Sequence, residues 1–204
     1  MIFVHNSEFS RHKPSEVSKS KWVRLAVEEF SVTHPQTGKT IGPAMREFIV
    51  CRPAVAILIH CPNEGKVLMS RQFRMPVMFN HINDDAVGGW IYEAIAGLVD
   101  DGENPLKTAI REAKEEAGIE IREEQVHYVG RFYTSPGIST EKIYVFTAEV
   151  EKALPENPSG GLENENEAIV SAWMTYAEVK ELLATERIQD FKTFTACRAI
   201  RQLD

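Results

Sequence analysis

Apolar and polar positions along the chain predict a series of β-strands separated by turn-forming stretches. Residues 22–32 and 45–51 carry apolar and aromatic positions suited to extended strands, and turn chemistry at 34–43 separates them. The nearly continuous apolar run at 52–61 is typical of a strand that is buried on both faces. Further strands are predicted at 67–74, 91–99, 127–135, 142–150 and 169–176.

Helices are predicted in three places, and the rest of the chain has the composition of loops. The predicted helices span 105–117, 177–187 and 187–203. Residues 75–90 and 152–168 are predicted loops, and the second is rich in Pro, Gly, Asn and Glu. Loops of that length in compact domains are usually functional or disordered. Residues 1–20 are polar and patternless, which predicts a flexible or weakly docked arm.

Mixed strands and helices indicate an α/β protein built in layers. The main domain is predicted to span residues 49–204, preceded by an arm and a small antiparallel β element in residues 1–48. Two strands alone bury too little surface to be stable independently. With 204 residues, 43% of them hydrophobic, the chain can bury a normal core in one domain with an appendage.

Charge and cysteine content exclude several classes of protein. A formal net charge of -7 argues against a nucleic-acid partner bound through its phosphates. Cys51, Cys61 and Cys197 are widely spaced, which indicates neither a disulfide framework nor a zinc site. No stretch approaches the roughly 18 consecutive apolar residues of a membrane span, and the first residues lack a signal-like apolar core. We therefore expect a cytoplasmic protein without a membrane or nucleic-acid partner.

The predicted helix at 105–117 has clear end signals. Asn104 can cap it, Pro105 suits the first helical position, and Gly118 stands where a left-handed terminating residue belongs. One apolar face at helical spacing is formed by Leu106, Ala109, Ile110, Ala113 and Ala117. The helix is therefore expected to pack on the rest of the domain by that face.

Three carboxylates crowd the end of this helix where its dipole repels anions. Glu112, Glu115 and Glu116 are neighbours at helical spacing near the C-terminus of the helix. A solvated acidic face is the ordinary interpretation of such a pattern. A divalent cation would instead convert the repulsion into binding, since Mg²⁺ takes carboxylate oxygens together with substrate phosphates.

The stretch GLVDDGENPLKTAIREAKEEAGI at 97–119 resembles the Nudix box, Gly-x5-Glu-x7-Arg-Glu-apolar-x-Glu-Glu-x-Gly-apolar, at every defined position. The matching residues are Gly97, Glu103, Arg111, Glu112, Ala113, Glu115, Glu116, Gly118 and Ile119. The resemblance implies the Nudix α/β/α sandwich around a mixed β-sheet. It also implies a Mg²⁺-dependent or Mn²⁺-dependent hydrolase of nucleoside diphosphates linked to another group.

The same resemblance implies roles for the residues of the box. Glu112 and Glu116 would be direct metal ligands, with Glu115 in the same cluster and the backbone carbonyl of Ala96 as a further ligand. Glu103 and Arg111 would form an ion pair that supports the loop against the helix, although an ordinary surface bridge is the alternative for that pair. Gly97 would allow a close approach at the corner between strand and loop.

Residues outside the box resemble the Nudix branch that cleaves ADP-ribose and related nucleoside diphosphate sugars. Glu93 precedes Gly97 by four residues as in that branch, RQFR at 71–74 is similar to its arginine pair, and residues 160–169 are similar to its acidic loop. The implied reaction splits ADP-ribose into AMP and ribose 5-phosphate. GDP-mannose or UDP-glucose is the alternative substrate, because the acidic loop and RIQDFKT at 187–193 resemble GDP-mannose enzymes too.

The reaction needs a carboxylate that takes a proton from the attacking water. Our hypothesis assigns this role to Glu165 and a further metal ligand to Glu167, both in the acidic loop. Glu115 is the alternative base. A solvated loop tip is the ordinary interpretation of Glu165 and Glu167 without the box.

Candidate substrate-binding residues lie outside the box. Arg71 and Arg74 could hold the diphosphate or the terminal sugar by paired hydrogen bonds, and surface arginines are the alternative. Trp90 could stack on a base, with core packing as the alternative. The remaining candidates are Glu93, Arg52, Ser135 and Gly137, and Ser135 is expected to shape its turn rather than act as a nucleophile.

The resemblance also implies a homodimer in which N-terminal strands exchange between subunits and help to build the partner's site. A non-catalytic sensor that binds ADP-ribose or a similar nucleotide is the alternative from a different class of protein. The complete box argues for the enzyme, since such sensors commonly lose box glutamates. The residues leave open which sugar is preferred and how many metal ions each site holds.

Overall fold

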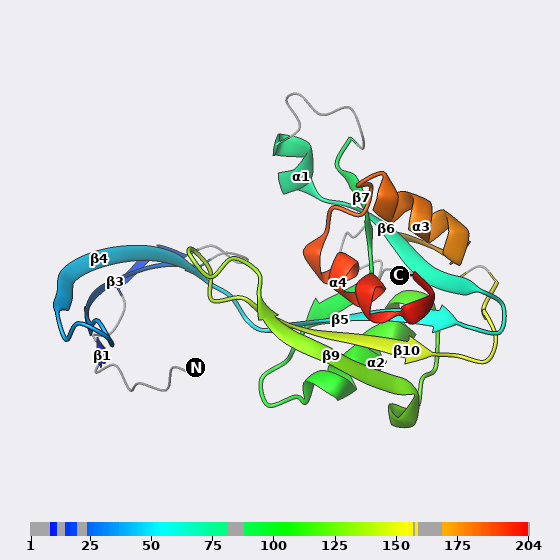
Figure 1. Ribbon diagram of the computed structural model, residues 1–204, viewed down its shortest axis with the longest axis horizontal. Helices are drawn as coiled ribbons and strands as arrows, with labels where there is room; N and C mark the ends of the chain where they lie inside the picture. The colour runs from blue at the N-terminus through cyan, green and yellow to red at the C-terminus, as the bar shows by residue number, and fades with distance from the viewer. Residues whose placement is uncertain are drawn as a thin grey trace. The chain divides into compact units, whose positions relative to one another are not determined.

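The computed structural model describes residues 9–11, 15–19, 24–80, 88–156, 158 and 169–203 (Figure 1). The chain divides into two compact units. Unit 1 combines Met1–Arg52 with Tyr133–Glu141, and unit 2 combines Pro53–Phe132 with Lys142–Asp204.

Unit 1 is an antiparallel sheet around one long hairpin. The strands are β1 (Phe9–Arg11), β2 (Ser15–Lys19), β3 (Arg24–Thr33) and β4 (Thr40–Val50). Strand β3 pairs with β4, and it also pairs with the short strands β1 and β2. The predicted antiparallel element is therefore present. Within the predicted arm, β1 and β2 pair with β3 through main-chain hydrogen bonds, which need no side-chain pattern and so leave no signal in the sequence.

Strand β4 begins inside the stretch that was predicted to be a turn. Gly42 has a φ of 115°, and the pairing with β3 shifts in register between Phe30 and Val32. A Cβ added at Gly42 would lie 2.6 Å from the Phe30 carbonyl oxygen. Glycine and Pro43 thus mark an irregularity within the strand rather than its end.

The sheet of unit 2 is mixed and has seven strands. They are β5 (Ala54–Cys61), β6 (Lys66–Phe73), β7 (Trp90–Glu93), β8 (Ile95–Leu98), β9 (Val126–Tyr133), β10 (Lys142–Glu149) and β11 (Ile169–Thr175). The order is β11-β6-β5-β10-β9, with β7 paired to β6 and β8 paired to β5. Strands β5 and β10 are parallel, whereas β11, β7 and β8 run antiparallel to their partners.

The predicted strand at 91–99 is two strands with different partners. Residues before Ala94 pair with β6, and residues after it pair with β5. The backbone N–H of Ala94 donates to Thr193 Oγ1 at 2.7 Å, so this residue bonds to a helix rather than to the sheet. An interaction across so much sequence leaves no local signal, and the break was not predictable from the apolar pattern.

Helices cover both faces of this sheet (Figure 1). Helix α2 (Pro105–Ala117) packs on one face against alternate β5 residues, and α3 (Tyr176–Ala184) and α4 (Phe191–Ala199) pack on the other. The β5 residues on the α2 face are Val55, Ile57 and Ile59, and those on the α3 and α4 face are Ala54, Ala56 and Leu58. This confirms the strand buried on both faces and the α/β/α sandwich.

Helix α3 ends three residues before its predicted end, and two other helices differ more from the prediction. Helix α1 (Met75–Asn80) stands at the start of a predicted loop, and Pro76 is tolerated there because it lies in the first turn. The closing helix begins only at Phe191, because the Asp190 side chain accepts a hydrogen bond from the Thr193 backbone N–H at 3.0 Å and caps the helix. Short 3-10 turns are found at Glu123–Gln125 and Arg201–Leu203. In the described part of the chain, no helix is long and apolar enough to cross a membrane.

Candidate active site

Local signals at both ends set the limits of helix α2, which spans Pro105–Ala117 as predicted. The Asn104 side chain accepts a hydrogen bond from the Leu106 backbone N–H at 2.8 Å. Gly118 takes the left-handed conformation, with φ at 66°, and its N–H donates to the Lys114 carbonyl at 2.9 Å. These caps satisfy main-chain groups that a helix end would otherwise leave unpaired.

Small side chains let α2 lie close to the sheet. Ala109, Ala113 and Ala117 are each 0% exposed, and they pack against strand residues on the α2 face. Glu112 lies among the buried residues of the same helix, with 8% of its surface exposed. The helix therefore holds one carboxylate against the sheet, not in solvent.

The Glu112 carboxylate lies against strand β8 at Gly97. A Cβ added at Gly97 would stand 2.0 Å from Glu112 Oε1 and 2.1 Å from its Cδ. Only glycine leaves room for the carboxylate here. The sequence predicted a close approach at this position, and the group that approaches is a side chain of the helix. Ala96, whose carbonyl is a predicted metal ligand, is the residue before Gly97 in the same strand.

Arg111 joins three box glutamates. Its Nε and Nη2 donate to the two carboxylate oxygens of Glu103 at 3.4 and 3.3 Å, so the predicted ion pair is present. Its Nη1 lies 2.9 Å from Glu112 Oε1 and 2.7 Å from Glu115 Oε2. One guanidinium therefore braces the loop before α2 and brings two of the crowded carboxylates together.

Electrostatics hold Arg111 and Glu103 in their charged forms. Hydrogen bonds from Arg111 lower the pKa of the Glu103 carboxyl below its ordinary value. Burial opposes the charge of Arg111, but hydrogen bonds to Glu103 and Glu115 outweigh it and raise the pKa of Arg111.

The other acidic residues predicted for the site are Glu116, Glu165 and Glu167. Glu116 lies one turn beyond Glu112 on α2 and is partly exposed. Glu165 and Glu167 lie outside the described residues. Within the described ranges, no three His, Cys, Asp or Glu side chains form a group that could hold a metal ion.

Comparison with known proteins identifies the family of this chain. Residues 51–197 match the NUDIX domain. The chain belongs to the Nudix family. This confirms the family that the box predicted, and the mixed sheet between helices is the fold that the family implies.

Three relatives of this Nudix chain cover most of its length. An ADP-ribose pyrophosphatase of Bacillus subtilis is 28% identical over 186 residues, which is 91% of this chain and 89% of the relative. A GDP-mannose pyrophosphatase of Yersinia enterocolitica is 31% identical over 179 residues, 88% of each chain. A methanol dehydrogenase activator of Bacillus methanolicus is 30% identical over 189 residues, which is 93% of this chain and 90% of the relative. The predicted class, a Nudix hydrolase, is confirmed.

Outside the Nudix box, two predicted substrate residues bind each other. Arg74 donates from Nε and Nη2 to Glu93 Oε2, at 3.0 and 2.7 Å. Lys192 Nζ donates to Glu93 Oε1 at 3.0 Å and lies 2.9 Å from Asp190 Oδ2. Asp190 and Lys192 lie in the segment RIQDFKT at 187–193, which the sequence marked only by its resemblance to GDP-mannose enzymes.

Arg71 and Trp90 lie beside aromatic rings. The Arg71 guanidinium carbon is 5.7 Å from the centre of the Tyr92 ring, and the side chain is exposed. Trp90 is half-buried and meets Phe73 edge to face, with ring centres 6.0 Å apart. Trp90 thus packs on Phe73, and Arg71 presents its charge at the surface.

Three further predicted residues belong to unit 1. Arg52 is exposed in the stretch that follows β4. The Ser135 carbonyl accepts hydrogen bonds from the backbone N–H groups of Ile138 and Ser139, at 3.1 and 2.8 Å, so this residue shapes its turn. A Cβ added at Gly137 would meet no atom within 4 Å.

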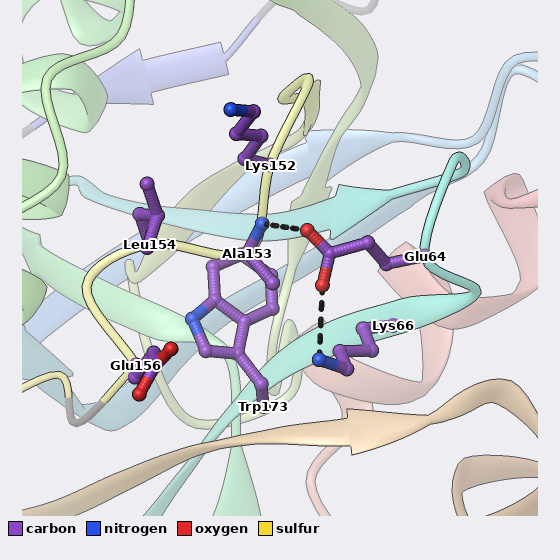
Figure 2. Close-up of a pocket in the computed structure, with 7 residues that line it drawn as sticks. All are labelled: Glu64, Lys66, Lys152, Ala153, Leu154, Glu156 and Trp173. Carbon is purple, nitrogen blue, oxygen red and sulfur yellow. Dashed lines mark hydrogen bonds and ion pairs between the residues drawn. The ribbon is translucent and has the colours of Figure 1, made fainter.

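A pocket of about 340 Å³ lies beyond the end of β5 that is opposite the box (Figure 2). Glu64 accepts hydrogen bonds from the Ala153 N–H at 3.0 Å and from Lys66 Nζ at 2.9 Å, and Trp173 Nε1 donates to the Pro155 carbonyl at 3.0 Å. The lining residues are Glu64, Lys66, Lys152, Ala153, Leu154, Glu156 and Trp173. Two acidic and two basic groups balance in charge, and no predicted site residue lines this pocket.

Proposed function

We propose that this Nudix hydrolase cleaves the diphosphate bond of ADP-ribose, giving AMP and ribose 5-phosphate. GDP-mannose or UDP-glucose is the alternative substrate. Relatives named ADP-ribose pyrophosphatase and GDP-mannose pyrophosphatase support the substrate class. One observation carries the proposal: the Glu112 carboxylate lies directly against Gly97. Arg111 holds it there through an ion pair, and Arg111 is itself paired with Glu103.

The residues around the Glu112 carboxylate fit a hard divalent cation, which prefers oxygen ligands. We assign Mg²⁺, with Mn²⁺ as the alternative, to the Ala96 carbonyl and to Glu112, Glu116 and Glu167. Glu112 already lies against β8, beside the residue that would supply the carbonyl. When bound, the metal supplies positive charge that stabilises phosphate oxygens and acidifies the attacking water.

The remaining residues of the proposed site position the substrate and move the proton. Water attacks phosphorus, and Glu165 takes its proton as the general base. Glu115 is the alternative base, and its Oε2 is paired with Arg111 at 2.7 Å. Arg71 and Arg74 would hold the diphosphate or terminal sugar through charge-assisted hydrogen bonds.

Turnover of a panel of nucleoside diphosphate sugars tests the proposed function. We expect ADP-ribose to be hydrolysed fastest with Mg²⁺, and addition of EDTA to stop the reaction. Phosphate released from the products by an added phosphatase is the readout. Preferred hydrolysis of GDP-mannose or UDP-glucose would select the alternative substrate. Binding of ADP-ribose without any metal-dependent turnover would instead identify a sensor.

Glutamine substitutions separate the two candidate bases. Glu165→Gln should lower kcat by about 10²-fold to 10⁴-fold, the usual contribution of a general base. Glu115→Gln should lower kcat less than about tenfold, since Arg111 keeps two other partners. Calorimetry with Mn²⁺ checks that both variants still bind metal. Unchanged turnover of metal-loaded Glu165→Gln would remove that assignment.

A cytoplasmic homodimer through the N-terminal strands completes the proposal. Three unpaired cysteines suit a reducing compartment. The β4 residues Ile41 and Met45 are 49% and 55% exposed, which suits a surface that a second subunit covers. Sedimentation equilibrium of the chain gives its mass, and a monomer at all concentrations would exclude the dimer.

A further inference from the structure

Four charged side chains form a chain of ion pairs beside the strand that leads into the box. Glu93 is 4% exposed and Lys192 is 9% exposed. Lys192 bridges Glu93 and Asp190 at 3.0 and 2.9 Å, and Glu93 holds Arg74 at 2.7 Å. Buried charges are retained only when each has a partner, because desolvation of a lone charge is costly.

This network ties the start of α4 to the break between β7 and β8. Thr193 Oγ1 accepts the Ala94 N–H at 2.7 Å, and Thr193 is itself hydrogen-bonded to Asp190, the residue that caps α4. Lys192 adds a second link to Glu93, the neighbour of Ala94. Gly97, which seats the Glu112 carboxylate, follows four residues after Glu93.

The carboxylate of Glu93 is divided between two cations. Its Oε2 receives both hydrogen bonds from Arg74, and its Oε1 receives the hydrogen bond from Lys192. The Glu93 side chain is 5% exposed, whereas the Arg74 side chain is 36% exposed. Arg74 is therefore held at one edge by a buried carboxylate while part of its surface faces solvent. Glu93 thus contacts Arg74 on one side and Lys192 on the other.

We propose that Lys192 is a positioning residue, which fixes Glu93 so that Glu93 orients Arg74 toward the substrate diphosphate. The inference rests on the proposed function for the role of Arg74. A methionine at 192 would leave Glu93 Oε1 buried without its cation. Glu93 would then turn to keep its charge paired, and Arg74 would lose its fixed direction.

Kinetics of a double-mutant cycle test this chain of action. Lys192→Met should raise KM for the best substrate about 10-fold to 100-fold and change kcat by less than about threefold, because binding in the ground and transition states falls equally. In an Arg74→Gln background the same change should alter KM less than about twofold. A full KM effect in that background, a loss of kcat at constant KM, or no effect in the parent chain would overturn the proposal.

Two further variants make the cycle interpretable. Lys66→Met is the matched control, since Lys66 also pairs with a glutamate, at 2.9 Å, but lies at the surface in the opposite part of the sheet. Its KM should not change. Glu93→Gln preserves shape and should reproduce the KM increase of Lys192→Met, so it decides the question if the methionine variant does not fold. An unchanged KM in Glu93→Gln would overturn the proposal.

A crystal structure of Lys192→Met, or of Glu93→Gln if the first does not fold, separates this inference from the proposed function. We expect the Arg74 guanidinium to leave its parent position relative to β7 in either variant, because the carboxylate or amide at 93 is no longer fixed by Lys192 from its other side. Arg74 kept in its parent orientation would overturn the inference even if ADP-ribose is hydrolysed. Absence of turnover by the parent chain would remove the proposed function and leave this structural result to decide the positioning role.

Discussion

Replacing Glu112 by glutamine should lower kcat by about 10³-fold, equivalent to roughly 4 kcal/mol of transition-state stabilisation. The amide keeps the shape of the side chain but removes the negative charge proposed to hold the metal. The fold should survive, because Arg111 retains its pairs with Glu103 and Glu115. Initial rates at saturating substrate across a Mg²⁺ series, with thermal melting in parallel, measure both effects.

Glu120→Gln is the matched control for this substitution. Glu120 follows α2, pairs with Lys114 at 2.9 Å, and is 80% exposed in its side chain. Its loss should leave kcat and the Mg²⁺ dependence unchanged, since exposed ion pairs contribute little. Should Glu112→Gln keep more than about a tenth of parent kcat at every Mg²⁺ concentration, Glu112 would not be a metal ligand.

Gly97→Ala is expected to lower activity by displacing the Glu112 carboxylate. The new Cβ would stand 2.0 Å from Glu112 Oε1, a distance that real atoms do not tolerate. The carboxylate is the mobile end of a side chain, so it should move away while the helix stays in place. We expect kcat to fall about 10²-fold, with weaker Mn²⁺ binding, because a displaced ligand costs much of the metal's contribution. Calorimetry and steady-state rates measure the two effects.

Gly102→Ala is the control for Gly97→Ala, because it should lower stability and leave the kinetics unchanged. Gly102 has a φ of 81°, and a Cβ there would meet no atom within 4 Å. The added methyl group should strain the backbone by about 1–3 kcal/mol and lower the melting temperature without displacing a ligand. If Gly97→Ala lost stability and kept parent kinetics, as expected of Gly102→Ala, the contact of Glu112 with Gly97 would have no catalytic role.

The parts of the fold that sequence predicted well are those with local signals. Helix α2 has a capping Asn104, a first-turn Pro105 and a terminating Gly118, and its observed ends are the predicted ones. The apolar run of β5 likewise indicated burial on both faces, which the two core clusters confirm. In the site, the ion pair of Glu103 and Arg111 followed from the box alone.

The parts that sequence did not predict depend on contacts between distant residues. The bond from Ala94 to Thr193 joins residues 99 positions apart, and so does the bond from Lys192 to Glu93. Neither has a periodic pattern, so the split strand and the buried lysine were missed. The burial of Glu112 was missed for the same reason, because a helical wheel does not show that Gly97 will lie opposite.

The dependence of the β7–β8 break on α4 limits how this chain can be shortened. Ala94 has its hydrogen-bond acceptor on Thr193, and Ile200 and Leu203 belong to the core cluster on that face of the sheet. A truncation that stops before Asp190 would strip this partner from the strand entering the box. Fragments intended to contain unit 2 therefore have to extend through Leu203. A fusion tag at the C-terminus needs a spacer after Leu203.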